Sequence, residues 1–319
     1  MITHQTVIVN GIRMHVAEDG DGPLVVLLHG WPELWYSYRS QLEALAGAGY
    51  HAVAPDQRGF GQTDAPMAIE DYTLLHTAGD VVGLIAALGE ERAVVVGHDW
   101  GSAVASAVGL FRPDIVRGVV LLSVPYGPRD EVDVLTSLKE TLGPNNYQEF
   151  FQEPGVAEKV LEEDVGQSVR SALIGASGDA PSVNTLADVS TGELFAGVTP
   201  STPLPSWLSE EDVAYYTSEY TRTGYRGGLN WYRNSRRNWE LMASWHGAPL
   251  LPPSMFIAGD RDLVYHWPGI KELVGVLQDV SMPNLTKTAT LEGCGHWTQQ
   301  ERPTDVNQLL LEFLAGLPE

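Results

Sequence analysis

The first part of the chain alternates short hydrophobic runs with segments of helical periodicity. Uninterrupted runs rich in Val and Leu predict buried strands, and segments between them, such as 77–88 and 102–111, predict helices. The predicted strands cover residues 5–9, 24–28, 51–54, 93–96 and 118–122. Such strands joined by helices are typical of a mostly parallel sheet with helices on both faces.

The same alternation returns near the end of the chain, with strands at 254–258 and 288–291 and a helix at 271–277. A last helix is predicted to open at Pro303, because proline is favoured in the first turn of a helix. Its apolar positions follow the spacing of one helix face: Val306, Leu309, Leu310, Phe313 and Leu314.

Residues 129–247 break this pattern. They contain no convincing buried strand, and polar, Pro- and Ser-containing stretches separate their helical segments; the clearest is a predicted loop at 192–208. We therefore expect an α/β core, made of residues 1–128 and 248–319, that is interrupted by an inserted helical cap at 129–247. A chain of 319 residues is long enough for such a core.

The strongest chemical signal is a Gly-x-Asp-x-Gly run at 97–101, which links the strand ending at Val96 to a helix. This is the nucleophile-elbow pattern, with Asp99 where serine is more common. The glycines allow a sharp turn that lifts the central side chain out of the carboxyl end of the sheet. The helix that follows favours a negative charge at its N-terminus. Taken alone, Asp99 is equally well explained as a helix N-cap.

Two further polar side chains match this elbow. In enzymes built on it, the order along the chain is nucleophile, acid, histidine. The strand 254–258 leads into Asp260 and Asp262, and the strand ending at Leu291 leads to His296. Both positions lie just past strand carboxyl ends, where such a sheet carries its active site. The order predicts a triad of Asp99, Asp262 and His296, with Asp262 preferred to Asp260 as the orienting acid.

A backbone contribution to the site is expected in the turn after strand 24–28. An amide in this turn pairs, in the elbow architecture, with the amide of the residue after the nucleophile to form an oxyanion hole. The candidates are the backbone N–H groups of Trp31 and Trp100. A cis bond is expected between Trp31 and Pro32. The run at 56–61 is interpreted as a structural loop.

The identity of the nucleophile narrows the reaction. A serine at the elbow attacks carbonyl substrates and suits acyl transfer. A carboxylate is a poor acyl acceptor but a competent nucleophile at saturated carbon. Asp99 therefore indicates alkyl transfer, as in the opening of an epoxide or the displacement of a halide.

Composition excludes several other classes of protein. A formal net charge of -22 disfavours nucleic-acid and anionic-membrane partners. Neither a transmembrane run of 18 or more apolar residues nor a signal-peptide pattern is visible. The single cysteine, Cys294, excludes an internal disulfide and a multi-cysteine metal site. We expect a soluble cytoplasmic protein, and a homodimer is left open.

In these residues and in the runs around them, the chain resembles the epoxide hydrolases of the α/β-hydrolase superfamily over nearly its whole length. The resemblance rests on core runs at 29–32, 97–101 and 295–303 and on cap runs at 146–155 and 229–234. Residue by residue, it implies that Tyr147 and Tyr232 are the ring-opening acids. A proline-rich stretch at 196–206 departs from the family.

The resemblance implies the α/β-hydrolase fold and a two-step reaction without a metal or organic cofactor. Its partners are a small-molecule epoxide and water. Asp99 forms an alkyl ester with an epoxide carbon while Tyr147 and Tyr232 donate to the departing oxygen. His296, oriented by Asp262, then activates a water that hydrolyses the ester, and the product is a vicinal diol.

Two alternatives remain open at this point. A haloalkane dehalogenase shares the Asp nucleophile and the following Trp, but it often carries Asn where Trp31 stands, or a second Trp, to bind halide. A non-catalytic binding module on the same fold is disfavoured because every triad member is present.

Candidate pocket residues are aromatic. Core or surface packing explains each of them equally well, and His98 and Cys294 are assigned no role. The pocket candidates are Trp35, Tyr36, Trp267 and Trp297.

Overall fold

The computed structural model describes residues 1–180, 189, 194 and 197–318. Its strands form one sheet in the order β1-β2-β4-β3-β5-β6-β7-β8. β1 pairs with β2 and β2 with β4 in antiparallel fashion, and the other neighbouring strands are parallel. The strands are β1 (Thr3–Val9), β2 (Ile12–Asp19), β3 (Leu24–Leu28), β4 (His51–Pro55), β5 (Ala93–His98), β6 (Val116–Leu122), β7 (Ser254–Gly259) and β8 (Leu285–Leu291).

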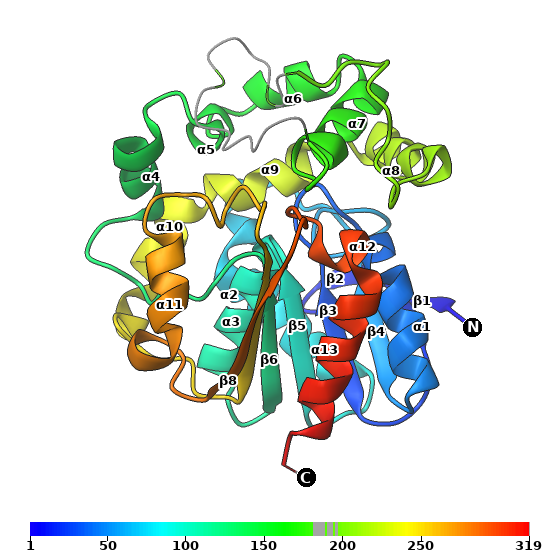
Figure 1. Ribbon diagram of the computed structural model, residues 1–319, viewed down its shortest axis with the longest axis vertical. Coiled ribbons are helices and arrows are strands. Elements are labelled where there is room, and N and C mark those ends of the chain that lie inside the picture. The colour runs from blue at the N-terminus through cyan, green and yellow to red at the C-terminus, as the bar shows by residue number, and fades with distance from the viewer. Residues whose placement is uncertain (181–188, 190–193, 195–196, 319) are drawn as a thin grey trace.

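Helices cover both faces of the sheet (Figure 1). Because successive side chains of a strand point to opposite faces, Val25 and Leu27 pack in one apolar cluster, whereas Val26 and Leu28 pack in the other. The first cluster includes residues of α1 and α13, and the second includes residues of α2, α3 and α11. These helices are α1 (Arg39–Gly47), α2 (Leu74–Ala87), α3 (Trp100–Phe111), α11 (Ile270–Val280) and α13 (Pro303–Ala315).

The middle of the chain contributes helices that lie over one end of the sheet, above the carboxyl ends of its parallel strands (Figure 1). The helices of this middle segment are α4 (Val134–Leu142), α5 (Tyr147–Phe150), α6 (Val156–Leu161), α7 (Val165–Gly175), α8 (Glu210–Thr223), α9 (Arg226–Arg233) and α10 (Ser235–Leu241).

The remaining regular elements of the described residues are short. They are α12 (Thr298–Glu301) and the 3₁₀ turns η1 (Trp35–Tyr38), η2 (Ile69–Tyr72) and η3 (Met242–Trp245).

The hydrophobic pattern predicted most of these elements but not β2. The last helix begins at Pro303, and its five predicted apolar residues are all buried. β2 carries His15 on a buried position, where its ring contacts the carboxylate of Asp56, so this strand has no continuous apolar run.

The loop predicted at 192–208 contains no helix or strand from 197 onward. Residues 192, 193, 195 and 196 of that loop, and 196 of the proline-rich stretch, lie outside the described residues. Within the described part of the chain, no helix has the length and apolar character needed to cross a membrane.

Candidate active site

Asp99 lies in the turn between β5 and α3. Its backbone has φ 52° and ψ -118°, a conformation that residues with a side chain rarely adopt. It occupies the N-cap position of α3, but its side chain makes no capping hydrogen bond. Instead, Oδ1 accepts a hydrogen bond from the backbone N–H of Trp31 at 2.9 Å. The strained turn therefore directs the carboxylate away from the helix that it precedes.

The two flanking glycines permit this turn through close packing. A Cβ on Gly97 would collide with the carbonyl of Gly101, and a Cβ on Gly101 would collide with the carbonyl of Leu28. Neither glycine has a positive φ. The close approach of strand and helix requires these glycines, while Asp99 itself adopts the strained conformation.

The predicted acid and histidine lie beside Asp99. The Nδ1 atom of His296 is 3.0 Å from Oδ1 of Asp262, and its Nε2 atom is 3.6 Å from Oδ2 of Asp99. Asp262 is fully buried, and its Oδ1 also accepts from the N–H of Val264 at 2.8 Å. Asp260 instead accepts from the N–H of Gly293. The geometry therefore pairs Asp262, rather than Asp260, with His296.

The charges of this triad depend on one another. Burial by itself would lower the pKa of His296, but the carboxylates of Asp262 and Asp99 raise this pKa well above 6.5. Burial by itself would raise the pKa of Asp99, but His296 and the Trp31 N–H hold this pKa below its usual value. Asp99 is therefore ionised at neutral pH, as a nucleophilic carboxylate must be.

Of the two backbone amides predicted for an oxyanion hole, the amide of Trp31 contacts the Asp99 carboxylate. The Trp31 N–H is already bonded to Oδ1, and the peptide bond between Trp31 and Pro32 is cis, as expected. Trp100 is the first residue of α3, so its N–H has no acceptor within the helix.

Tyr147 and Tyr232 come from α5 and α9 and meet above Asp99. Their ring centroids are 5.8 Å apart, and both side chains are buried. The Oη of Tyr147 accepts a hydrogen bond from Nε2 of Gln148 at 3.1 Å. Burial, and then the charge of Asp99, raise the pKa of both phenols. Both hydroxyls therefore keep their protons at neutral pH.

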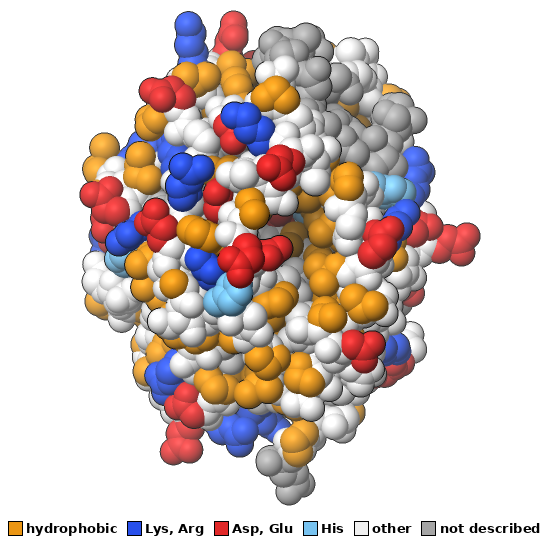
Figure 2. Space-filling view, turned by 90° about the vertical axis from the view of Figure 1, so that its left-hand side faces the viewer, with side chains coloured by type: hydrophobic (Ala, Val, Ile, Leu, Met, Phe, Trp, Pro, Cys, Tyr) orange, Lys and Arg blue, Asp and Glu red, His pale blue; other side chains and the backbone are white. Residues whose placement is uncertain are grey.

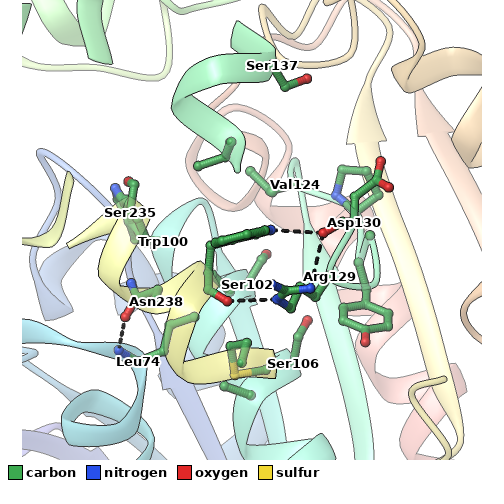
Figure 3. Close-up of a pocket in the computed structure, with 18 of the residues that line it drawn as sticks. Leu74, Trp100, Ser102, Ser106, Val124, Arg129, Asp130, Ser137, Ser235 and Asn238 are labelled. Atoms are coloured by element: carbon green, nitrogen blue, oxygen red, sulfur yellow. Dashed lines mark hydrogen bonds between the residues drawn. The ribbon is translucent and has the colours of Figure 1, made fainter. Parts of the chain in front are cut away.

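Two chambers meet at these residues. Asp99, Tyr147, Tyr232 and Val264 line both of them. The larger chamber has a volume of about 480 Å³ and extends along α3, α4 and α10. The smaller chamber has a volume of about 30 Å³ and contains His296 in its wall. Figure 3 shows the larger chamber with Trp100, Ser102 and Ser106 of α3, Ser137 of α4, and Ser235 and Asn238 of α10.

Two of the four candidate pocket residues line these chambers. Trp267 lines the larger chamber and Trp297 the smaller. Trp35 and Tyr36 line neither of them; the Trp35 indole donates to the hydroxyl of Tyr215, and the Tyr36 ring stacks on the same tyrosine. These two residues join the core to α8.

His98, for which the sequence predicted no role, lies behind the triad and contacts the backbone of His296. Its ring is fully buried, with Nδ1 2.7 Å from Oε2 of Glu33 and Nε2 2.7 Å from the carbonyl oxygen of His296. A carbonyl only accepts, so Nε2 donates. Ser123 donates to the same carbonyl. Adjacency to Asp99 was the only signal in the sequence that singled out His98.

No group of three or more His, Cys, Asp or Glu side chains in the described part of the chain is arranged to hold a metal ion. The buried Cys294 has a raised pKa, caused chiefly by burial, so its thiol is neutral.

Comparison with known proteins points to one family. The model of the α/β hydrolase fold matches residues 23–303. Epoxide hydrolase 3 of Siraitia grosvenorii is 42% identical over 98% of each chain, and epoxide hydrolase A of Mycobacterium tuberculosis is 42% identical over 99% of this chain and 98% of its own. The crystal structure of epoxide hydrolase A from Mycobacterium thermoresistibile matches with a TM-score of 0.92 at 39% identity, covering 100% of this chain and 99% of its own.

Proposed function

The chain belongs to the epoxide hydrolases of the α/β-hydrolase fold, and on this basis we propose that it converts epoxides to vicinal diols through a covalent ester on Asp99. The observation that carries the proposal is the position of an ionised carboxylate between a histidine on one side and two protonated tyrosines on the other. An epoxide at the junction of the chambers would meet all three groups.

In the first step, Oδ2 of Asp99 attacks an epoxide carbon. Oδ1 accepts from the Trp31 N–H, so the attacking oxygen is Oδ2, which faces Nε2 of His296 at 3.6 Å. The carbon–oxygen bond of the ring breaks, and its electron pair goes to the ring oxygen. Tyr147 and Tyr232 donate hydrogen bonds to this oxygen, and one of them transfers its proton.

In the second step, His296 removes a proton from a water that attacks the ester carbonyl. Ester formation removes the negative charge of Asp99, which is one of the two charges that raise the pKa of His296. The proton that His296 holds in the free enzyme is therefore lost more readily. It passes to the tyrosinate before water is activated, which leaves His296 neutral and able to act as the base. The amides of Trp31 and Trp100 stabilise the tetrahedral oxyanion. When it collapses, the alkoxide takes this second proton from His296, and the diol leaves. The proton left on the Asp99 carboxyl then passes to His296, which restores the starting charges.

We also propose that residues 129–247 act as a cap. They supply Tyr147 and Tyr232, while the core supplies Asp99, Asp262 and His296. The site would therefore be complete only when the cap lies on the core.

An isotope experiment tests the covalent step. In a single turnover in ¹⁸O-water, we expect unlabelled diol and a label in the Asp99 peptide, because the oxygen given to the diol comes from the carboxylate. Mass spectrometry of the diol and of a peptide digest measures both. A second turnover should then release labelled diol. Label in the diol of the first turnover would mean direct attack by water.

The pH dependence of the second step is a further prediction. Ester hydrolysis requires neutral His296, so its rate should rise with pH and level off above the pKa of His296 in the ester. Loss of the Asp99 charge lowers that pKa, so the midpoint should lie below the pKa of His296 in the free enzyme. Single-turnover kinetics give the midpoint, and histidine NMR gives the free-enzyme value. A midpoint at or above the NMR value would contradict the charge coupling.

A further inference from the structure

The two chambers that meet at Asp99 differ about sixteenfold in volume, at 480 and 30 Å³. An epoxide held at the junction has two ring carbons, and substituents on them that point in opposite directions would enter different chambers. The volumes of the chambers therefore limit what each carbon can carry.

The smaller chamber is closed by bulky groups. Apart from the shared residues, Trp31, Pro32, Ala176, Leu263, His296 and Trp297 line it. The volume of the smaller chamber is about 30 Å³. A water molecule needs roughly 10–15 Å³ of cavity volume, so the chamber holds two waters, or one methyl group and one water. His296 borders this chamber and not the larger one. His296 and Asp99 both line the smaller chamber, which therefore has the groups that the hydrolytic water needs.

The larger chamber is long and reaches the surface. On α3 it is lined by the small side chains of Ala103, Ser106 and Ala107, and at one end by Val132 and Val134, which are exposed. A helix rises about 1.5 Å per residue, so the chamber extends at least about 10 Å from Trp100. Figure 2 shows the face that carries α4 and α10, where hydrophobic side chains gather around a hollow.

Polar groups at the outer end of the larger chamber are bonded to one another. The Nε of Arg129 donates to the Trp239 carbonyl at 2.8 Å, and the Trp239 indole donates to the Asp130 carbonyl at 2.9 Å (Figure 3). The Arg129 guanidinium also stacks on the Trp239 ring. These contacts and the apolar lining favour a neutral substituent.

We propose that this enzyme selects epoxides that carry a bulky neutral substituent on one ring carbon and only hydrogen or methyl on the other. The inference rests on the proposed function and adds its substrate class. The bulky group fills the larger chamber, and the small one leaves room for the hydrolytic water beside His296. An aryl group on both carbons would displace that water and overlap the walls of the smaller chamber.

A series of three aryl epoxides tests this. Styrene oxide, trans-β-methylstyrene oxide and trans-stilbene oxide keep one phenyl group and place hydrogen, methyl or phenyl on the second carbon. We expect diol from the first two and a kcat/KM at least about 100-fold lower for the third, because a rigid pocket rejects groups that it cannot contain.

Substitutions in each chamber, with one control, locate the discrimination. Leu263 lines only the smaller chamber, so Leu263→Ala should raise the kcat/KM ratio of stilbene oxide to styrene oxide by about tenfold or more. Leu263→Val, a milder truncation, should move the ratio in the same direction if the alanine variant fails to fold. Ala107→Phe narrows the larger chamber and should lower the kcat/KM ratio of 1,2-epoxydodecane to epoxybutane. Val276→Phe, on the exposed face of α11, is the matched control and should change neither ratio.

The outcomes separate the two proposals. If stilbene oxide is hydrolysed as efficiently as styrene oxide, the size limit is wrong and the epoxide hydrolase function stands. If both Leu263 variants fold but leave the ratio unchanged, the smaller chamber does not set the limit. If none of the epoxides gives diol, the proposed reaction is wrong and the substrate class with it.

Discussion

Replacing His296 by glutamine is expected to stop the reaction after its first step and to leave the alkyl ester on Asp99. Glutamine cannot act as the base for water, and the loss of general-base catalysis typically costs about 10²–10⁴-fold in rate. Asp99 keeps its bond from the Trp31 N–H and can still attack. Intact-protein mass spectrometry after epoxide addition should find a gain equal to the mass of the substrate.

The pKa of Asp99 must be considered in this experiment. His296 helps to hold that pKa down, so the variant should be assayed on the alkaline side of neutrality, where Asp99 remains ionised. His266→Gln is a suitable control because the His266 side chain is exposed and its ring contacts the carbonyl of Asp260; only its backbone N–H, which the substitution keeps, bonds to the carbonyl of Asp262. A folded His296→Gln protein that binds epoxide but forms no adduct would show that His296 is needed for the first step.

Removing both cap hydroxyls, with Tyr147→Phe and Tyr232→Phe together, should abolish most ring opening. The alkoxide that leaves carbon is a far stronger base than a halide, so an acid must meet it during bond cleavage. Removing one transition-state donor typically costs about 10²-fold or more, and the double variant should lose more than either single variant. Stopped-flow quenching of tryptophan fluorescence on mixing with epoxide measures ester formation.

The Tyr double variant needs a stability measurement and a control substitution. Tyr147→Phe leaves Nε2 of Gln148 without its Tyr147 acceptor, which can cost about 1–3 kcal/mol of stability. Thermal unfolding should therefore accompany the kinetics. Tyr50→Phe, at a tyrosine that lines neither chamber, should leave the first phase unchanged. A double variant that forms the ester as fast as the parent would exclude the tyrosines as acids. Chloride release from 1-chlorobutane by the parent enzyme would then favour halide chemistry.

Local sequence patterns predicted most of the strands, though not β2, and the order of the three residues that the structure brings together. Asp99, Asp262 and His296 each follow a hydrophobic run, and parallel strands bring their carboxyl ends to the same edge of a sheet. The residue type at position 99 also indicated the reaction class, because a carboxylate is a competent nucleophile at saturated carbon. These properties depend on short stretches of chain, so they can be inferred from the sequence alone.

Other features of the site depended on contacts between distant parts of the chain. Only the packed structure separated Trp267 and Trp297, which line the chambers, from Trp35 and Tyr36, which pack against α8. All four are aromatic, and the sequence does not say which way a side chain faces. The support that His98 gives to His296 joins residues 198 positions apart, so no local pattern predicts it.

The sequence by itself thus predicted the α/β architecture, a candidate nucleophile, and the order along the chain of the groups proposed to act with it. The tertiary structure alone decided the charges of these groups and the space around them. The pKa values of Asp99 and His296 depend on their burial and on each other's charge. The two chambers are spaces that side chains of the core and of residues 129–247 leave unfilled. Their volumes are therefore set only when the whole chain is packed.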